Sequence, residues 1–286
     1  MSKKIIMITG ASRGLGKFLS EYFIDIGHDL ILVSSNIEKL KKNTKDIDLA
    51  SNQKLHIISA NYLEKEFEKK MFSSIKKFSK NIDVLINNAA TQFPIGPFVD
   101  TNFEEWEKNF KVNFVSTALV IKKTISFMKN KSGGSIINIS GGGSTSPRPN
   151  LSAYACSKTA LVRLTETLSY EFDQKNLNIN INAIAPGAMP TTMMKELLDF
   201  PDEIVGKHEK ELAKKTLSSS SEMNSVGKLC DFLISSSARN ITGKLISAKW
   251  DNWSKWPENS KKLDKGDLYT LRRITSRDRG FDWGDL

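Results

Sequence analysis

The sequence predicts an α/β protein with a doubly wound, Rossmann-type parallel sheet of about seven strands and helices on both faces. Short runs of Ile, Val and Leu alternate with longer amphipathic stretches along most of the chain. These apolar runs show little polar alternation, as expected of strands that are covered on both faces. A glycine-rich turn joins the first apolar run to the first amphipathic stretch. Strand–helix–strand repetition of this kind implies right-handed crossovers and a parallel sheet.

The expected elements follow in chain order. Strands are expected at residues 4–9, 29–34, 54–59, 83–87, 135–140, 178–183 and 244–247. Helices are expected at residues 14–26, 37–45, 64–80, 103–129, 152–174 and 222–236. Ligands of an open parallel sheet bind beyond the carboxyl ends of its strands. The residues that directly follow each strand are therefore the first candidates for a site.

The chain of 286 residues is long enough for one large domain, and we assign residues 1–248 to it. Residues 189–221 have a helical composition and lie between two strands, which suggests a cover over a substrate site. Residues 249–286 form an extension that is rich in Trp and Arg and holds four of the five tryptophans. We expect this extension to pack on its own or a neighbouring subunit, or to form a wall of the substrate site.

Several classes of protein are disfavoured by composition. No apolar stretch approaches the roughly 20 residues that span a bilayer, and the short run after Met1 ends at Thr9, so we expect a cytoplasmic protein without membrane contact. The two cysteines and three scattered histidines predict neither a disulfide framework nor a metal site. The net charge of +10 is spread over mixed, lysine-rich stretches, so we expect a solvated surface and no nucleic-acid binding.

The turn ITGASRGLG has the form of a phosphate-binding turn between a strand and a helix. Gly10 permits the tight turn, Gly14 lets the backbone approach a pyrophosphate, and Gly16 allows close packing of helix on strand. The N-terminus of the helix offers unpaired N–H groups and a partial positive charge to the phosphates. The residues assigned to cofactor binding here are Gly10, Ser12, Arg13, Gly14, Leu15 and Gly16.

The end of the second strand favours NADP(H) over NAD(H). Enzymes that use NAD usually place Asp or Glu near this point to bind the ribose 2′-hydroxyl. Here the chain reads Ser34-Ser35-Asn36, so no carboxylate would repel a 2′-phosphate. Arg13 is placed to pair with that phosphate, and Ser34 and Ser35 can add hydrogen bonds.

A tyrosine and a lysine are expected on one face of the helix at 152–174. Tyr154 and Lys158 are four residues apart and therefore about one helical turn from each other. A tyrosine has a pKa of about 10 and is a poor base near neutral pH, but a neighbouring ammonium favours the phenolate. The pair is a candidate acid/base unit.

Other candidates lie where strands end. Asn88, Ala89 and Ala90 follow the fourth strand, and Pro186-Gly187 follows the sixth. Small residues at these places leave room for a flat ligand.

With these motifs in order and in register over residues 3–247, the chain resembles the short-chain dehydrogenase/reductase family in its single-domain form. The resemblance implies that Tyr154 exchanges a proton with the substrate oxygen, while Lys158 lowers the pKa of that tyrosine and holds the nicotinamide ribose. It implies that Asn113 supports a water chain that relays protons. It places Asn61, Asn88, Ala89, Ala90, Pro186, Gly187 and Thr191 around the cofactor. It also implies a homodimer or homotetramer formed through the helices at 103–129 and 152–174.

One position departs from the family pattern. Members usually carry a serine thirteen residues before the tyrosine, whereas this chain has Gly141 there. Ser140 or Ser144 can replace that serine because a glycine run is able to re-aim the loop, although strand alternation argues against Ser140. Backbone N–H groups of the run are a second possibility. A weak or inactive enzyme is the third.

The function expected from these features is hydride transfer between NADP(H) and a carbonyl/alcohol pair, with Tyr154 as acid/base. The substrate expected is a small molecule, either a polar or sugar-like compound or a 3-oxoacyl thioester. The alternative is a cofactor-binding sensor or partner protein that has kept the fold and lost turnover.

Overall fold

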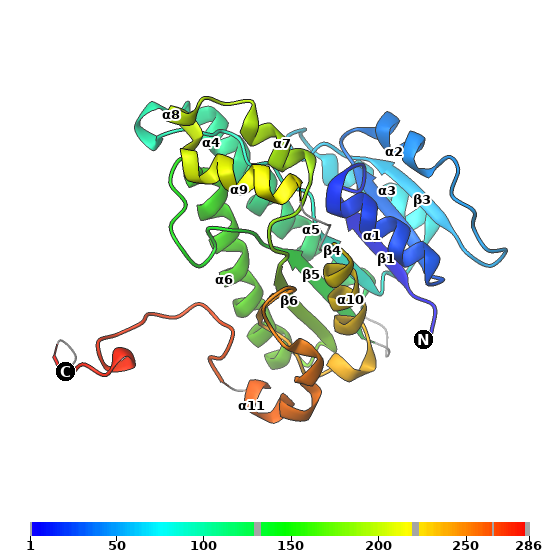
Figure 1. The fold of residues 1–286 in the computed structure, drawn as a ribbon. Coiled ribbons are helices and arrows are strands. Elements are labelled where there is room, and N and C mark those ends of the chain that lie inside the picture. The colour runs from blue at the N-terminus through cyan, green and yellow to red at the C-terminus, as the bar shows by residue number, and fades with distance from the viewer. Residues whose placement is uncertain (1, 129–132, 219–222, 265, 284–286) are drawn as a thin grey trace.

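The computed structural model describes residues 2–128, 133–218, 223–264 and 266–283. Its centre is a sheet of seven parallel strands in the order β3-β2-β1-β4-β5-β6-β7 (Figure 1). The strands are β1 (Ile5–Thr9), β2 (Asp29–Ser34), β3 (Leu55–Ser59), β4 (Val84–Asn87), β5 (Gly134–Ile139), β6 (Ile179–Ala185) and β7 (Leu245–Ser247). The predicted fold class is confirmed, and each strand begins and ends within two residues of its expected bounds.

The order of the strands reverses at β1. This strand pairs with β2 on one side and with β4 on the other. Successive crossovers therefore leave it in opposite directions, which opens a crevice at the carboxyl ends of β1 and β4. Thr9 and Asn87 end these two strands, so the glycine turn and the segment that begins at Asn88 face the same crevice.

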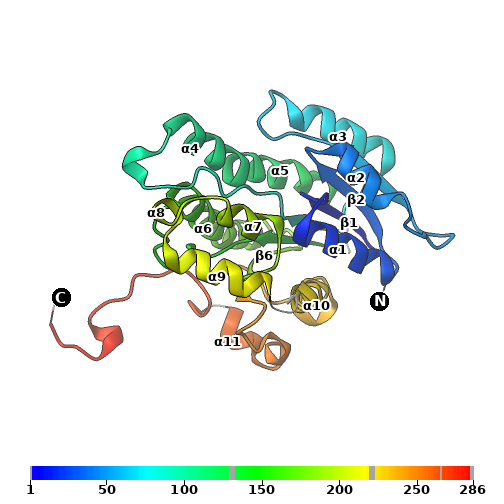
Figure 2. The same ribbon diagram turned by 45° about the horizontal axis from the view of Figure 1, so that its top comes forward.

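Two apolar cores lie on opposite faces of the sheet because strand side chains alternate in direction. On one face, Ile6, Ile8 and neighbouring strand residues pack with α1 (Gly14–Asp25) and α10 (Met223–Leu233). On the other face, Met7 and its neighbours pack with α3 (Phe67–Phe78), α5 (Ser116–Thr124) and α6 (Ser152–Gln174). Figure 2 shows α1 and α10 on the side of the sheet opposite to α5. The short α2 (Ile37–Thr44) adds Leu40 to the first core.

The helix expected at residues 103–129 is interrupted. It consists of α4 (Phe103–Phe110), a π-helical turn (Lys111–Val115), α5, and a 3₁₀ turn (Ile125–Phe127). A π-turn inserts one residue into the helix and commonly marks a functional site, and Asn113 lies within it. Helical periodicity alone does not reveal such an insertion. Lys129 lies outside the described residues, as does Glu222 at the start of the helix expected at 222–236.

Residues 189–218 form a helical cover over the carboxyl ends of the strands (Figure 1). The cover contains α7 (Thr192–Leu198), α8 (Asp202–Val205) and α9 (Lys207–Leu217). Leu197, Val205 and Ala213 form a small apolar core of its own. Met189, at the start of the cover, packs against the first main core.

The C-terminal extension has two parts. Trp253 packs against Phe232, and the buried Trp256 stacks on Tyr269, whose carbonyl accepts a hydrogen bond from the backbone N–H of Leu245. Between about residue 272 and residue 283 the chain extends away from the body (Figures 1 and 2). None of the helices in the described part of the chain combines the length and apolar character needed to cross a membrane.

The packing of α1 on the glycine turn generates the first prediction. A Cβ at Gly16 would lie 2.3 Å from the carbonyl oxygen of Gly10. Gly16→Ala should therefore lower the free energy of unfolding by about 3 kcal/mol or more, because rigid backbone must move. Urea unfolding followed by circular dichroism measures the change.

Gly142→Ala is the matched control for that measurement. A Cβ there would meet only the Arg148 side chain, at 3.5 Å. Its effect should stay below about 1 kcal/mol. Equal losses in the two variants would contradict the close-packing role of Gly16.

Candidate active site

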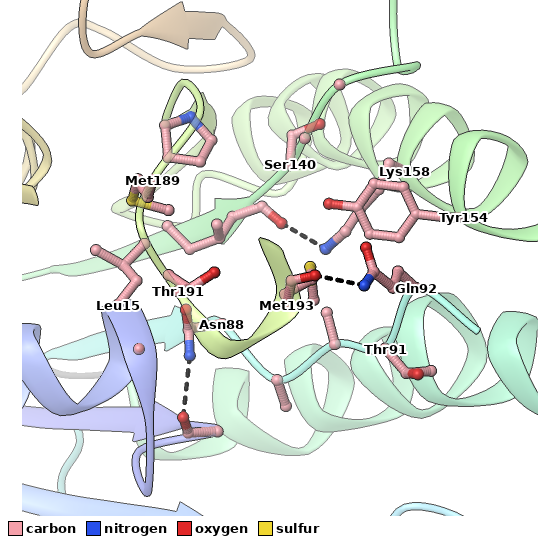
Figure 3. A pocket seen from close by; sticks show the side chains of 18 of the residues that line it. Leu15, Asn88, Thr91, Gln92, Ser140, Tyr154, Lys158, Met189, Thr191 and Met193 are labelled. Carbon is pink, nitrogen blue, oxygen red and sulfur yellow. Dashed lines mark hydrogen bonds between the residues drawn. The ribbon is translucent and has the colours of Figure 1, made fainter. Parts of the chain in front are cut away.

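A cavity of about 990 Å³ lies at the carboxyl ends of the strands, between the glycine turn and the cover. Figure 3 shows residues from the first turn, the segments after β4, β5 and β6, the cover and helix α6 converging on it. It is lined by every predicted site residue except Gly16 and Asn113: Gly10, Ser12, Arg13, Gly14, Leu15, Ser34, Ser35, Asn61, Asn88, Ala89, Ala90, Ser140, Tyr154, Lys158, Pro186, Gly187 and Thr191. The structure therefore brings together residues from the whole length of the domain.

The glycine turn leaves its backbone open to a ligand. Gly10 has φ +67°, and a Cβ there would lie 2.7 Å from Cα of Ala89. Gly14 has φ +53° and faces Thr191 of the cover. Arg13, at the N-cap of α1, makes no side-chain cap, so the first N–H groups of the helix remain available. These features fit a bound pyrophosphate.

The ends of β1 and β4 are joined by hydrogen bonds beside this turn. The Thr9 hydroxyl oxygen accepts from the backbone N–H groups of Asn88 and Ala89, at 3.0 and 3.1 Å. The Asn88 side-chain amide donates in turn to the carbonyl of Thr9 at 3.0 Å. The two strand ends that flank the crevice are thereby held at a defined separation.

Polar side chains surround the end of β2. Ser34 donates a hydrogen bond to Ser12 at 2.8 Å and accepts one from the backbone N–H of Asn36 at 3.0 Å. Arg13 is ion-paired with Glu196 of α7 at 2.7 Å. Glu196 was not predicted from the sequence, because it lies far along the chain from Arg13 and outside any motif. The guanidinium forms the pair through one of its nitrogens, and the Arg13 side chain stays 41% exposed.

Tyr154 and Lys158 are both buried and project from α6 into the cavity (Figure 3). The Lys158 ammonium donates to the carbonyl of Ile139 at 2.7 Å and lies 5.7 Å from the centre of the Tyr154 ring. Burial lowers the pKa of Lys158 to about 8. Burial raises the pKa of Tyr154, while the positive charge of Arg148 opposes that rise. Burial thus favours the protonated phenol of Tyr154, and a lowering of its pKa by Lys158 stays a prediction.

Asn113 is fully buried beneath the cavity and does not line it. Its amide donates to the carbonyl of Thr91, to Asn109 and to Ser157. Its oxygen accepts from the backbone N–H of Thr91. Asn113 therefore fixes the segment after β4 against α4 and α6. A role in a proton relay stays a prediction.

Steric crowding explains why position 141 is a glycine and not the serine of the family pattern. A Cβ there would lie 2.2 Å from the hydroxyl oxygen of Tyr154, so the tyrosine fills the space that a side chain would need. Ser140 next to it is buried, lines the cavity, and its hydroxyl has no hydrogen-bond partner among the described residues. Because β5 ends at Ile139, strand alternation does not decide where Ser140 points. The orphaned hydroxyl is available to a substrate.

A second ion pair in the cavity wall was not predicted. Arg148, in the loop between β5 and α6, donates from Nη2 and Nε to the carboxylate of Glu209 at 2.8 and 3.3 Å. Glu209 belongs to α9, so this pair joins the cover to the loop between β5 and α6. Gln92 makes a third link, donating to the carbonyl of Met193 at 2.6 Å (Figure 3). The described part of the chain holds no group of three or more His, Cys, Asp or Glu side chains placed to share a metal ion.

Comparison with known proteins is consistent with this geometry. Residues 4–202 match the family model of the short-chain dehydrogenases. The chain is 29% identical over 244 residues to the 3-oxoacyl-[acyl-carrier-protein] reductase of Aquifex aeolicus, covering 85% of this chain and 94% of that protein.

Two solved structures are similar over most of the chain. The NADPH-dependent reductase YwfH, involved in bacilysin biosynthesis, is 26% identical with a TM-score of 0.75, covering 86% of this chain and 97% of that one. A 4-hydroxyisoleucine dehydrogenase complexed with NADH is 25% identical with a TM-score of 0.72, covering 86% of this chain and 96% of that one.

The buried ammonium of Lys158 predicts a pH dependence of stability. A pKa of about 8 in the folded protein lies below the ordinary lysine pKa of 10.5. Above pH 8 the folded protein therefore binds fewer protons here than the unfolded chain, so its stability rises with pH. Between pH 7.5 and 9.5 this contribution should grow by about 2 kcal/mol. It should be absent in Lys158→Met.

The measurement is the difference in unfolding free energy between wild type and Lys158→Met at the two pH values, which cancels the other titrating groups. Lys210→Met, at an ammonium paired with Asp202 in the cover, is the control and should show no such rise. A constant difference between wild type and Lys158→Met would show that Lys158 keeps an ordinary pKa.

Proposed function

This chain belongs to the short-chain dehydrogenase family of oxidoreductases, and we propose that it interconverts a carbonyl and a secondary alcohol with NADP(H). The observation that carries the proposal is one cavity that extends from the phosphate-binding turn to the buried Tyr154 and Lys158. The names of similar structures, which include an NADPH-dependent reductase and a dehydrogenase with NADH, support a nicotinamide cofactor.

The residues present fit such a cofactor. Gly10 and Gly14 form a cradle that Cβ atoms would fill, and the open N-terminus of α1 suits a pyrophosphate. The small residues Ala89, Ala90 and Gly187 line the cavity and leave room for a flat ligand. When bound, the nicotinamide supplies or accepts the hydride. Asn61 and Thr191 are assigned to the two ends of the same site.

Tyr154 handles the proton in this proposal. Its raised pKa keeps the hydroxyl protonated, which suits donation to a carbonyl oxygen that becomes an alkoxide. The phenolate left behind is stabilised by the ammonium of Lys158 and the guanidinium of Arg148, both within 6 Å of the ring centre. Ser140 donates the hydrogen bond that the family serine would supply.

NADP(H) is the preferred cofactor in this proposal because residues 34–36 carry no carboxylate. A carboxylate there would repel a 2′-phosphate. Arg13 retains nitrogens beyond the one that binds Glu196, and a phosphate can engage them in a charge-assisted pair.

The remaining assignments are also proposals. Residues 189–218 act as a substrate cover, and Trp250 of the extension adds to the cavity wall. Phe103, Val115 and Tyr170 are exposed on the helices expected to form a homodimer or homotetramer. The substrate is a polar compound or a 3-oxoacyl thioester, the latter favoured by the reductase from Aquifex aeolicus. We place the protein in the cytoplasm.

Cofactor preference is tested by titrating the protein with NADPH and NADH and following nicotinamide fluorescence. Wild type should bind NADPH more tightly than NADH. Arg13→Ala should weaken NADPH binding about tenfold and leave NADH binding unchanged, because only NADPH carries the 2′-phosphate. Glu196→Gln is the control, since it breaks the same ion pair but keeps Arg13 and should not weaken NADPH binding. Equal weakening of NADPH binding by both variants would show that Arg13 does not recognise the 2′-phosphate.

The role of Ser140 is tested by Ser140→Ala beside Tyr154→Phe. Loss of the orphaned hydroxyl should leave the free energy of unfolding unchanged or slightly raised, because no internal hydrogen bond is broken. In a reductase assay on a carbonyl panel it should lower kcat about 10²-fold, while Tyr154→Phe should lower it about 10³-fold. Full activity of Ser140→Ala would indicate that backbone N–H groups of the glycine run, and not Ser140, bind the substrate oxygen.

A further inference from the structure

Neighbouring residues fix the side chain of Arg148 in the wall of the cavity. Its guanidinium carbon lies 5.8 Å from the centre of the Tyr154 ring. A Cβ at Gly142 would already contact its Nη1 at 3.5 Å. Gly143 has φ +95°, and a Cβ there would come within 2.8 Å of Cβ of Ala155. The glycine run thus packs tightly and seats Arg148 beside the catalytic tyrosine.

The charge of Arg148 is balanced from the cover. The Arg148 and Glu209 side chains are only 16% and 17% exposed. Among the described residues that line the cavity, Glu105 and Glu209 are the carboxylates, and Glu105 pairs with Lys108 at 2.6 Å. Glu209 is therefore the lining carboxylate available to the positive groups around Tyr154.

We propose that Arg148 binds the carboxylate of an oxo-acid or hydroxy-acid substrate, and that Glu209 occupies this position until the substrate displaces it. The inference rests on the proposed function, since it places the reacting carbon of that acid at Tyr154. Arg148 is a specificity-determining residue in this assignment, and Glu209 competes with the substrate carboxylate for it.

The chemistry of the pair suits an exchange of carboxylates. A largely buried guanidinium needs a counterion, and removing one without replacement is costly. Its planar fork matches any carboxylate that enters. Glu209 stands in the first turn of the eleven-residue α9, where the partial positive charge of the helix N-terminus continues to stabilise it after displacement.

The position of Arg148 also limits the size of the acid. Guanidinium and phenol are neighbours in one wall, so a single small molecule engages both only if its carboxylate and carbonyl are a few bonds apart. Displacement of Glu209 would break the link between α9 and the loop that joins β5 to α6. The links from Arg13 to Glu196 and from Gln92 to Met193 would still hold α7 in place.

The test measures binding to the NADPH complex, which cannot oxidise an alcohol and so gives a dead-end complex without turnover. Isothermal titration calorimetry is run with lactate, 3-hydroxybutyrate and 4-hydroxypentanoate, whose carboxylates lie one to three bonds from the hydroxyl-bearing carbon, and with their ethyl esters. At least one acid should bind wild type more tightly than its ester. Glu209→Gln should tighten binding of that acid about tenfold and leave the ester within threefold.

Arg148→Gln should weaken binding of the same acid at least thirtyfold, with the ester within threefold. Arg272→Gln is the matched control, because Arg272 is also ion-paired with carboxylates but does not line the cavity. This variant should change the binding of neither the acid nor the ester. If Arg148→Gln fails to fold, the gain expected in Glu209→Gln decides alone.

Two results would overturn the inference while NADPH still binds. One is that no acid binds better than its ester in wild type or in Glu209→Gln. The other is that both variants weaken the binding of acid and ester equally, as expected if the ion pair of Arg148 and Glu209 only stabilises the fold. Failure of NADPH itself to bind in the same titrations would instead overturn the proposed function.

Discussion

The arrangement of the site depends on the contact between the carboxyl ends of β1 and β4. These strands are neighbours in the sheet at the point where the crossovers reverse direction. The Thr9 hydroxyl accepts hydrogen bonds from two successive N–H groups at the end of β4, Gly10 packs against the backbone of Ala89, and Gly16 packs against Gly10 and the Asn88 side chain. If this contact were looser, the glycine turn and the segment after β4 would not keep a fixed separation. A Cβ at Gly10 would push the turn away from the end of β4, and a Cβ at Gly16 would push α1 away from the turn.

Burial of charge dominates the other end of the cavity. Lys158 and Arg148 stand near a buried phenol, and each has a polar partner, the carbonyl of Ile139 and the carboxylate of Glu209. Burial pushes the pKa of Lys158 down and that of Tyr154 up, so both groups are closer to their neutral forms than in water. Such groups respond strongly to any ligand that adds or removes a charge. The cover takes part in this balance because it supplies Glu196 and Glu209 to two arginines of the site.

The elements were largely predictable because their causes are local. The runs of Ile, Val and Leu predicted the strands, and the boundaries at Thr9, Ser34 and Asn87 agree with the structure. The π-turn around Asn113 was not predictable, since an inserted residue leaves helical composition unchanged. The steric reason for Gly141 was equally hidden, because it depends on where the Tyr154 hydroxyl lies in space.

By itself the sequence determined the parallel sheet, the glycine turn between β1 and α1, and the spacing of Tyr154 and Lys158 on one helix. Each of these follows from residues that are close in the chain, where periodicity and backbone preference decide. Only the tertiary structure decided that Glu196 pairs with Arg13, that Glu209 pairs with Arg148, and that Ser140 keeps a buried hydroxyl without a partner. Electrostatic pairing and burial are properties of neighbours in space, and here those neighbours lie up to 183 residues apart in the chain.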